Sequence, residues 1–180
     1  MIDRTWNFIG SEGTVTEQGC RLNDGRCTAA NGGQDTIKTS GCDSNERPVT
    51  VTYDKASYLG MDVGSNKSIV GKGNKGVFHG KGLRFKAGAR NVIIQNIHID
   101  NLNPKYVWGG DAISLSGNDG VWIDHVKVCL QEVVLCLKKI LIVYNRSPGL
   151  EDSISSHSKS LWPCARPDKL TCPPATTLPA

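Results

Sequence analysis

Asp111 is the residue whose sequence surroundings most suggest chemistry. It follows two glycines in the stretch YVWGGDAISL, and short apolar runs bracket it on both sides. A carboxylate in such a place is either a working group in a cleft or the cap of a turn where a strand begins. Trp108, on the same stretch, offers an aromatic face that either binds a ligand or packs against the protein. Together they define a candidate site.

Asp124 and His125 form a second chemically tempting pair, in the run VWIDHV. Adjacent residues of a strand point to opposite faces, so we expect that these two cannot act together on one substrate. Trp122, in the same run, is expected to pack in the core or at a turn.

Cys20, Cys27 and Cys42 lie close together in a region rich in glycine, asparagine and aspartate. Three such cysteines raise the alternative of a zinc site. No C-x-x-C pair and no suitably spaced histidine accompanies them, however, and structural disulfides are therefore favoured.

The elements that must position these residues are short strands separated by polar turns. Turns lead into β-branched runs at NKSIVGKG from Asn66, ARNVIIQNIHI from Ala89 and NDGVWIDHVKV from Asn118, without a helical period between them. Such recurrence predicts coils of a parallel β-helix. Asn96 falls among aliphatic residues, and buried amides must be hydrogen-bonded. We therefore expect Asn96 to have a structural role among stacked asparagines.

The composition is typical of one all-β domain. A chain of 180 residues can bury a real core, and its 20 glycines favour strands and tight turns. The net charge of +4 is too small and too scattered to indicate nucleic-acid binding. Seven cysteines suit an oxidising compartment, whereas the N-terminal residues MIDRTWNFIG carry no signal-peptide pattern. A chain that has lost its true beginning would reconcile the two.

The repeating pattern stops near Lys127. We therefore divide the chain into a partial β-helix over residues 1–126 and an unmatched tail over residues 127–180. The first part of the tail is long and apolar, compatible with a helix, and its charged residues argue against a membrane span. The second part is rich in serine and proline and is expected to be disordered.

The chain resembles the pectate lyase superfamily, and within it the fungal pectin lyases, over about residues 2–128. Three motifs carry the resemblance, in the family's order: the coil SIVGKG, the segment NPKYVWGGDAI and the signature VWIDH. The resemblance implies a right-handed parallel β-helix. It also implies secretion and cleavage of galacturonan by β-elimination, in which a base removes the C5 proton and the C4 oxygen leaves.

The resemblance further assigns roles to Asp111 and Trp108. Pectate lyases hold Ca²⁺ with carboxylates that include an Asp-Gly-Asp triplet, which here reads Gly109-Gly110-Asp111. One carboxylate is a poor cage for Ca²⁺, so the chain is expected to use no metal and to act on methyl-esterified polymer. Asp111 is then the catalytic-site carboxylate that orients an arginine, and Trp108 binds substrate.

The family's catalytic arginine lies on coils beyond the VWIDH signature, where this chain no longer matches. We therefore expect the chain to be incomplete and poorly active, and a mis-spliced or frameshifted gene would explain its tail.

Two modifications are expected. Cys20 and Cys42 should form a disulfide, because the ends of their loop must return to the same side of the solenoid, and Cys27 would then be left over. Asn66 heads the glycosylation sequon Asn66-Lys67-Ser68.

The sequence thus predicts a secreted, monomeric pectin lyase that needs no cofactor, binds methyl-esterified pectin, and binds neither nucleic acid nor membrane. Two alternatives stay open, a non-catalytic polysaccharide-binding β-helix and a Ca²⁺-dependent pectate lyase.

Overall fold

The computed structural model of the chain describes residues 1–23 and 34–129, together with the backbone of residues 137–144. Regular structure in these ranges is almost entirely β, arranged in three sheets, with one short helix, α1 (Lys55–Tyr58). The strands are β1 (Thr5–Asn7), β2 (Thr14–Leu22), β3 (Asp35–Thr36), β4 (Glu46–Asp54), β5 (Met61–Val63), β6 (Lys67–Val70), β7 (Val77–His79), β8 (Leu83–Phe85), β9 (Arg90–Gln95), β10 (His98–Asp100), β11 (Tyr106–Val107), β12 (Ile113–Ser114), β13 (Asp119–Cys129) and β14 (Leu137–Tyr144).

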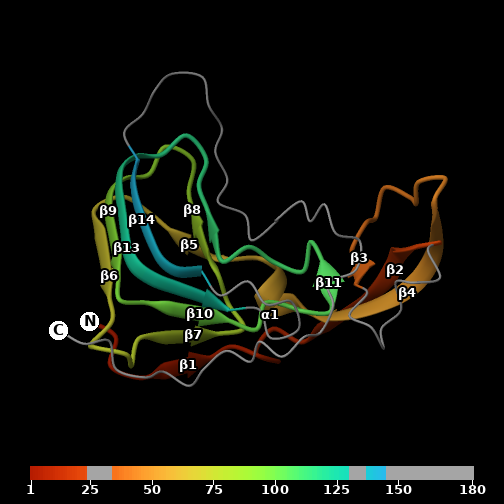
Figure 1. Cartoon of the computed structure of the whole chain (residues 1–180), viewed down its shortest axis with the longest axis horizontal. Helices are drawn as coiled ribbons and strands as arrows, with labels where there is room; N and C mark the ends of the chain where they lie inside the picture. The colour runs from red at the N-terminus through yellow and green to blue at the C-terminus, as the bar shows by residue number, and fades with distance from the viewer. Residues whose placement is uncertain (24–33, 130–136, 145–180) are drawn as a thin grey trace.

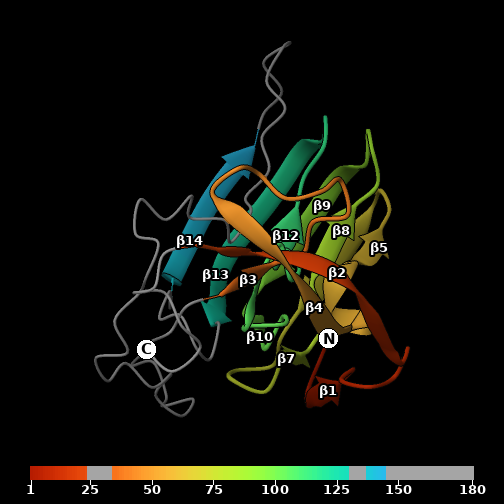
Figure 2. The same ribbon diagram turned by 90° about the vertical axis from the view of Figure 1, so that its right-hand side faces the viewer.

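Strands β5 to β10, with β12 and β13, wind into successive coils of a parallel solenoid (Figures 1 and 2). β5, β6 and β7 form one coil, and β8, β9 and β10 stack on it strand by strand, all in parallel register. β12 and β13 form the next coil, in which β13 pairs first with β9 and then with β10. The predicted all-β parallel β-helix is confirmed.

Asparagines in the left-handed region turn the chain at the corners of the coils. Asn66 and Asn91 both have φ of 56°, and Asn91 Nδ2 donates to Asn66 Oδ1 over 2.8 Å. Asparagine tolerates this region because its short amide can bond locally. Asn96, with φ of 54°, follows β9 at another corner and is only half-buried. The expected amide stacking therefore occurs, but Asn66 and Asn91 provide it, and Asn96 acts by bending the backbone.

Aliphatic side chains fill the inside of the coils. Along β9, Val92 and Ile94 are fully buried while Asn91 and Ile93 are exposed, as alternation along a strand requires. Burying each such aliphatic side chain contributes about 1.5–3 kcal/mol. Stacked coils thus share one continuous core, whose largest fully buried residues include Leu83, Ile94, Ile97, Ile99 and Ile123.

A second sheet, which we call the arm, extends from the solenoid and consists of β2, β3, β4 and β11 (Figures 1 and 2). β2 and β4 pair antiparallel over their whole lengths. Ile37, Val51 and Tyr53 form a small core in the arm, and Tyr106 of β11 packs against it. Because Tyr106 shortly precedes Trp108 and Asp111, the arm is anchored beside the candidate site.

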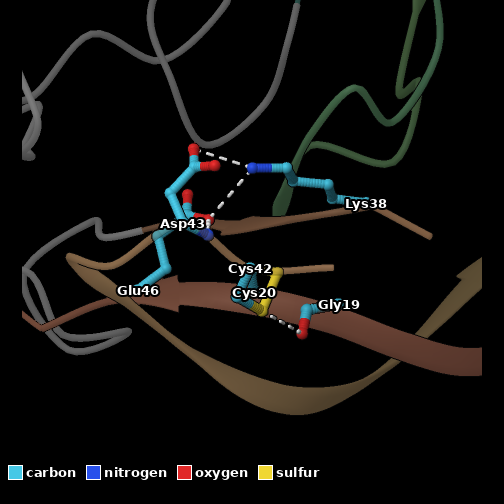
Figure 3. The surroundings of a disulfide bond; sticks show 6 residues. All are labelled: Gly19, Cys20, Lys38, Cys42, Asp43 and Glu46. Atoms are coloured by element: carbon cyan, nitrogen blue, oxygen red, sulfur yellow. Dashed lines mark hydrogen bonds and ion pairs between the residues drawn. A yellow bond between two sulfur atoms is a disulfide. The ribbon is translucent and has the colours of Figure 1, made fainter. Parts of the chain in front are cut away.

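The predicted disulfide between Cys20 and Cys42 closes one end of the arm (Figure 3). It joins residues 22 positions apart, and a crosslink over a loop of that size stabilises a fold by roughly 3 kcal/mol. The two sulfur atoms are bonded to each other, so they are not thiolate ligands for zinc. Cys27 lies outside the described residues, and Cys129 also takes part in a disulfide.

The structure differs from the expectation for the tail in two places. β13 runs through the boundary expected after residue 126, because Lys127 to Cys129 pair in parallel with β10. The segment expected to be compatible with a helix contains β14, which pairs antiparallel with β13. The pairing with β14 satisfies backbone groups along the edge of β13, which a helix would leave open. Among the described residues no helix is long and apolar enough to cross a bilayer.

Trp122 also differs from expectation, because it is 44% exposed rather than packed in the core. Its neighbours Val121 and Ile123 are the inward residues of β13, so alternation turns Trp122 outward. It lies in register with Ile93, which is 41% exposed on β9.

The burial of His98 predicts a pH-dependent stability. Burial lowers the pKa of His98 from its ordinary 6.5, with Lys127 and His79 acting in the same direction and Asp100 opposing them. The unfolded chain therefore takes up a proton at His98 more readily than the folded chain does. The free energy of unfolding should consequently fall as the pH drops through 6.5 towards the lowered pKa.

Urea denaturation at about pH 7.5 and 5.5 checks this prediction. His98→Gln should show a smaller loss of stability between the two pH values than the unmodified chain. His125→Gln removes an exposed histidine that contacts Asp124 instead of the buried one, and it should keep the loss that His98 causes. An unchanged loss in His98→Gln would contradict the assignment.

Candidate active site

Asp111 lies at the junction between the arm and the solenoid. It follows β11 of the arm and shortly precedes β12 of the solenoid. Its side chain is half-buried, and its Oδ2 accepts a hydrogen bond from Ser114 Oγ at 3.0 Å. Asp111 therefore bonds to a side chain of the three-stranded sheet β12-β8-β5. That contact links the candidate carboxylate to the outer surface of the coils.

Trp108 is held on the same loop in an unusual conformation. Its φ is 64°, and its side chain is 51% exposed. A bulky residue adopts a positive φ only where its surroundings impose it, at a cost on the order of 1–3 kcal/mol. An exposed indole at that position is available to stack on a flat apolar face, such as that of a sugar ring. The loop thus presents Trp108 and Asp111 a few residues apart.

Asn103 fixes this loop to the end of the arm. Its Nδ2 donates to the carbonyls of Asp54 and Gly109, at 2.9 and 2.8 Å, and its Oδ1 accepts from the Asp54 amide at 2.8 Å. Asp54 is in turn the N-cap of α1, accepting from Ala56 and Ser57. Because Asn103 is itself buried, loss of its amide would leave the backbone groups of Asp54 and Gly109 without these hydrogen bonds.

Gly109 and Gly110 are required because the backbone around them leaves no space. A Cβ on Gly109 would lie 2.6 Å from the Asn103 carbonyl oxygen, and one on Gly110 would lie 2.0 Å from the Ser57 carbonyl oxygen. Gly110 also has φ of 149°, which side chains rarely adopt. Asp111 is consequently the only residue of the Gly109-Gly110-Asp111 triplet that this backbone allows to carry a carboxylate.

The outer face of the three-stranded sheet carries a charged row that the sequence reasoning missed. Asp62, Arg84 and Ser114 are in register across β5, β8 and β12. Arg84 donates to Asp62 Oδ1 from Nε at 2.9 Å and from Nη2 at 2.6 Å. The sequence pattern that could have revealed the row is the alternation of Leu83, Arg84 and Phe85, in which only Arg84 is exposed. Since Ser114 also bonds Asp111, the row continues into the candidate site.

The expectation that Asp124 and His125 point apart is wrong. His125 Nδ1 lies 2.6 Å from Asp124 Oδ1, because φ of 50° at His125 breaks the alternation of the strand. The contact with His125 lowers the pKa of Asp124, and Gln95 adds a second hydrogen bond. The pair lies at a corner of the coil, where it supports the turn between the two halves of β13.

Asn66, the expected glycosylation residue, is exposed at the corner before β6. Its Oδ1 accepts from Asn91, as described above. Its modification stays a prediction.

The sequence model of a protein family described as pectate lyase matches residues 26–133, more than half of the chain. The chain belongs to the pectate lyase family. Its loop from Trp108 to Asp111 and the sheet beside it lie within the matched range.

Several curated relatives are similar to this pectate lyase family member. The probable pectin lyase F-2 of Aspergillus terreus is 56% identical over 131 residues, which cover 72% of this chain and 27% of that protein. The pectin lyase of Colletotrichum gloeosporioides is 53% identical over 142 residues, which cover 75% of this chain and 36% of that protein. The chain therefore spans about a third of the length of the relatives it matches.

The close approach at Gly109 gives a testable prediction. Gly109→Ala should lower the free energy of unfolding by about 1–3 kcal/mol, because the new Cβ overlaps the Asn103 carbonyl. Gly64→Ala is the matched control, since a Cβ there meets nothing within 4 Å. It should change stability by less than about 1 kcal/mol.

Chemical denaturation of the two variants makes the comparison. Equal stability changes at the two glycines would show that the loop can move away from Asn103, and would contradict the packing argument.

Proposed function

We propose that this chain forms one part of the substrate cleft of a pectin lyase, which cleaves methyl-esterified galacturonan by β-elimination without a metal ion. The observation that carries the proposal is the closed space at Gly109, which limits the Gly109-Gly110-Asp111 triplet to one carboxylate. Calcium prefers six to eight oxygen ligands, usually with several charges. The two curated relatives described above are named as pectin lyases, which supports the same choice.

The chemistry suits an ester better than an acid. The C5 proton is acidic because it lies next to the C6 carbonyl, and a neutral methyl ester withdraws electrons from C5 more strongly than an ionised carboxylate. A base removes the C5 proton, the electron pair forms the C4–C5 double bond, and the C4–O bond breaks. The departing oxygen takes up a proton. Positive charge near the C6 carbonyl stabilises the enolate-like intermediate.

We assign Asp111 to orient a basic side chain in this cleft, and Trp108 to stack on a sugar ring. The half-buried carboxylate of Asp111 is held by Ser114, and the Trp108 indole is exposed beside it. The arginine that takes the C5 proton is expected from coils that follow the VWIDH signature in the relatives. A secreted enzyme acting on plant cell walls is consistent with the disulfide of the arm.

A chimera tests this function. It joins residues 1–128 of this chain to the remaining coils of the Colletotrichum gloeosporioides pectin lyase. With highly methylated pectin, the chimera should release product with the ultraviolet absorbance of the new double bond, and a calcium chelator should not reduce the rate. The 180-residue chain alone should show little or no turnover. Loss of the chimera's activity on chelation would overturn the metal-free assignment.

Asp111→Asn in the same chimera tests the role of the carboxylate. Turnover should fall by about a hundredfold or more if the charge of Asp111 orients the cationic base, because a misplaced base loses a general-base contribution of about that size. An amide can still cap a turn, so only a mild loss would mean that Asp111 is a turn residue. Asp119→Asn, at an exposed position on β13, is the matched control and should leave the rate unchanged.

A further inference from the structure

The charged row beside Asp111 has the composition of an anion site. Asp62, Arg84 and Ser114 occupy the outer face of β5, β8 and β12 at one level of the solenoid. Lys86 is the first residue after β8, and its Nζ lies 4.0 Å from Asp62 Oδ2. Two cations thus share one carboxylate. The row carries a net positive charge on the side of the sheet that bonds Asp111 through Ser114.

Arg84 keeps donors available for a ligand. Its two hydrogen bonds to Asp62 both end on Oδ1, and a guanidinium has five N–H donors. The Arg84 side chain is 47% exposed and that of Lys86 is 65% exposed, so both can be reached from solvent. Hydrogen bonding by Arg84 also lowers the pKa of Asp62, which keeps that carboxyl ionised, so Asp62 competes with a ligand for the arginine.

A hollow of about 360 Å³ adjoins these side chains. Its lining includes Asp62, Arg84, Lys86, Ser114 and Ser116, so the charged members are the two cations and one carboxylate of the row. The volume lies at the lower end of small-molecule pockets, which start at about 300 Å³. The Ser116 hydroxyl in this lining can donate to an oxygen atom of a ligand, whereas the Ser114 hydroxyl already donates to Asp111. The second cation, Lys86, and the adjoining hollow distinguish this cluster from an ordinary surface ion pair.

We propose that Arg84 and Lys86 form a carboxylate subsite, which binds an un-esterified galacturonate unit of the same polymer whose esterified unit lies at Asp111. This inference rests on the proposed function for the identity of the polymer. A planar carboxylate matches the fork of the guanidinium, whereas a methyl ester presents no charge to it. The subsite would make the enzyme favour partly esterified pectin, in which acid and ester units alternate along one chain.

Direct binding to the 180-residue chain tests the subsite without relying on turnover. The probes are trigalacturonate and its trimethyl ester, titrated by calorimetry at low salt. Trigalacturonate should bind more tightly than the ester. Arg84→Gln should weaken the binding of trigalacturonate about tenfold, the loss of one charge-assisted contact worth about 1.4 kcal/mol. Its affinity for the trimethyl ester should not change.

Two further variants separate a binding role from a structural one. Arg90→Gln removes the same charge from an exposed position on β9 and should leave both affinities unchanged. Asp62→Asn removes the competing carboxylate and should tighten the binding of trigalacturonate. Circular dichroism checks that each variant is folded. If Arg84→Gln lowers stability, the opposite effect of Asp62→Asn still tests the subsite.

Three results would overturn the subsite: equal affinity for acid and ester, equal losses in Arg84→Gln and Arg90→Gln, or weaker binding in Asp62→Asn. Failure of the subsite can be told from failure of the lyase assignment. If the chimera is active but the 180-residue chain binds trigalacturonate independently of Arg84, only the subsite is refuted. An inactive chimera, with Arg84-dependent binding intact, would refute only the lyase assignment.

Discussion

The amide of Asn103 is the contact on which the candidate site depends. It bonds the end of β4 at Asp54 and the loop at Gly109 simultaneously, so the arm and the solenoid meet at one buried side chain. Holding Gly109 against Asn103 removes the space for any side chain there. The same contact therefore positions Asp111 and prevents a second carboxylate two residues before it. A structural hydrogen bond thus determines how many charges the site can offer.

The solenoid contributes a different constraint, which is repetition. Because coils stack in parallel, the middle residues of β5, β8 and β12 must lie in one row. Asp62 and Arg84 are far from Asp111 in the sequence, but the row brings them to Ser114 and so to the site. A row of side chains along the stacked coils suits an extended polymer better than a compact ligand. In the proposed subsite, discrimination between acid and ester units is divided between neighbouring positions along this row.

Much of this architecture was predictable from the sequence because its signals are local. Polar turns before β-branched runs identified the coils, and left-handed Asn66 and Asn91 do turn the chain at their corners. The disulfide of Cys20 and Cys42 followed from the need to close a loop. Trp108 and Asp111 were identified by resemblance, and the structure adds the reason for the glycines between them.

The remaining features depend on geometry that a linear sequence does not contain. The contact of Asp124 with His125 arises from the positive φ of His125, which interrupts the alternation that otherwise turns adjacent strand side chains to opposite faces. Trp122 is exposed because it lies between two inward-facing residues of β13, so its position in the strand outweighs its hydrophobicity. The strand β14 depends on the open edge of β13, and the pairing of Arg84 with Asp62 depends on coil stacking.

The loop at Gly109 offers one carboxylate, and we propose that it holds no calcium. The most direct measurement is a titration of the chimera, which carries the remaining coils, with Ca²⁺, followed by the backbone amide resonances of Gly109, Gly110 and Asp111. Up to about 10 mM Ca²⁺, above the roughly millimolar dissociation constants of weak extracellular calcium sites, these resonances should show no saturable shift. A saturable shift confined to these residues, with a midpoint at or below about 1 mM, would contradict the account.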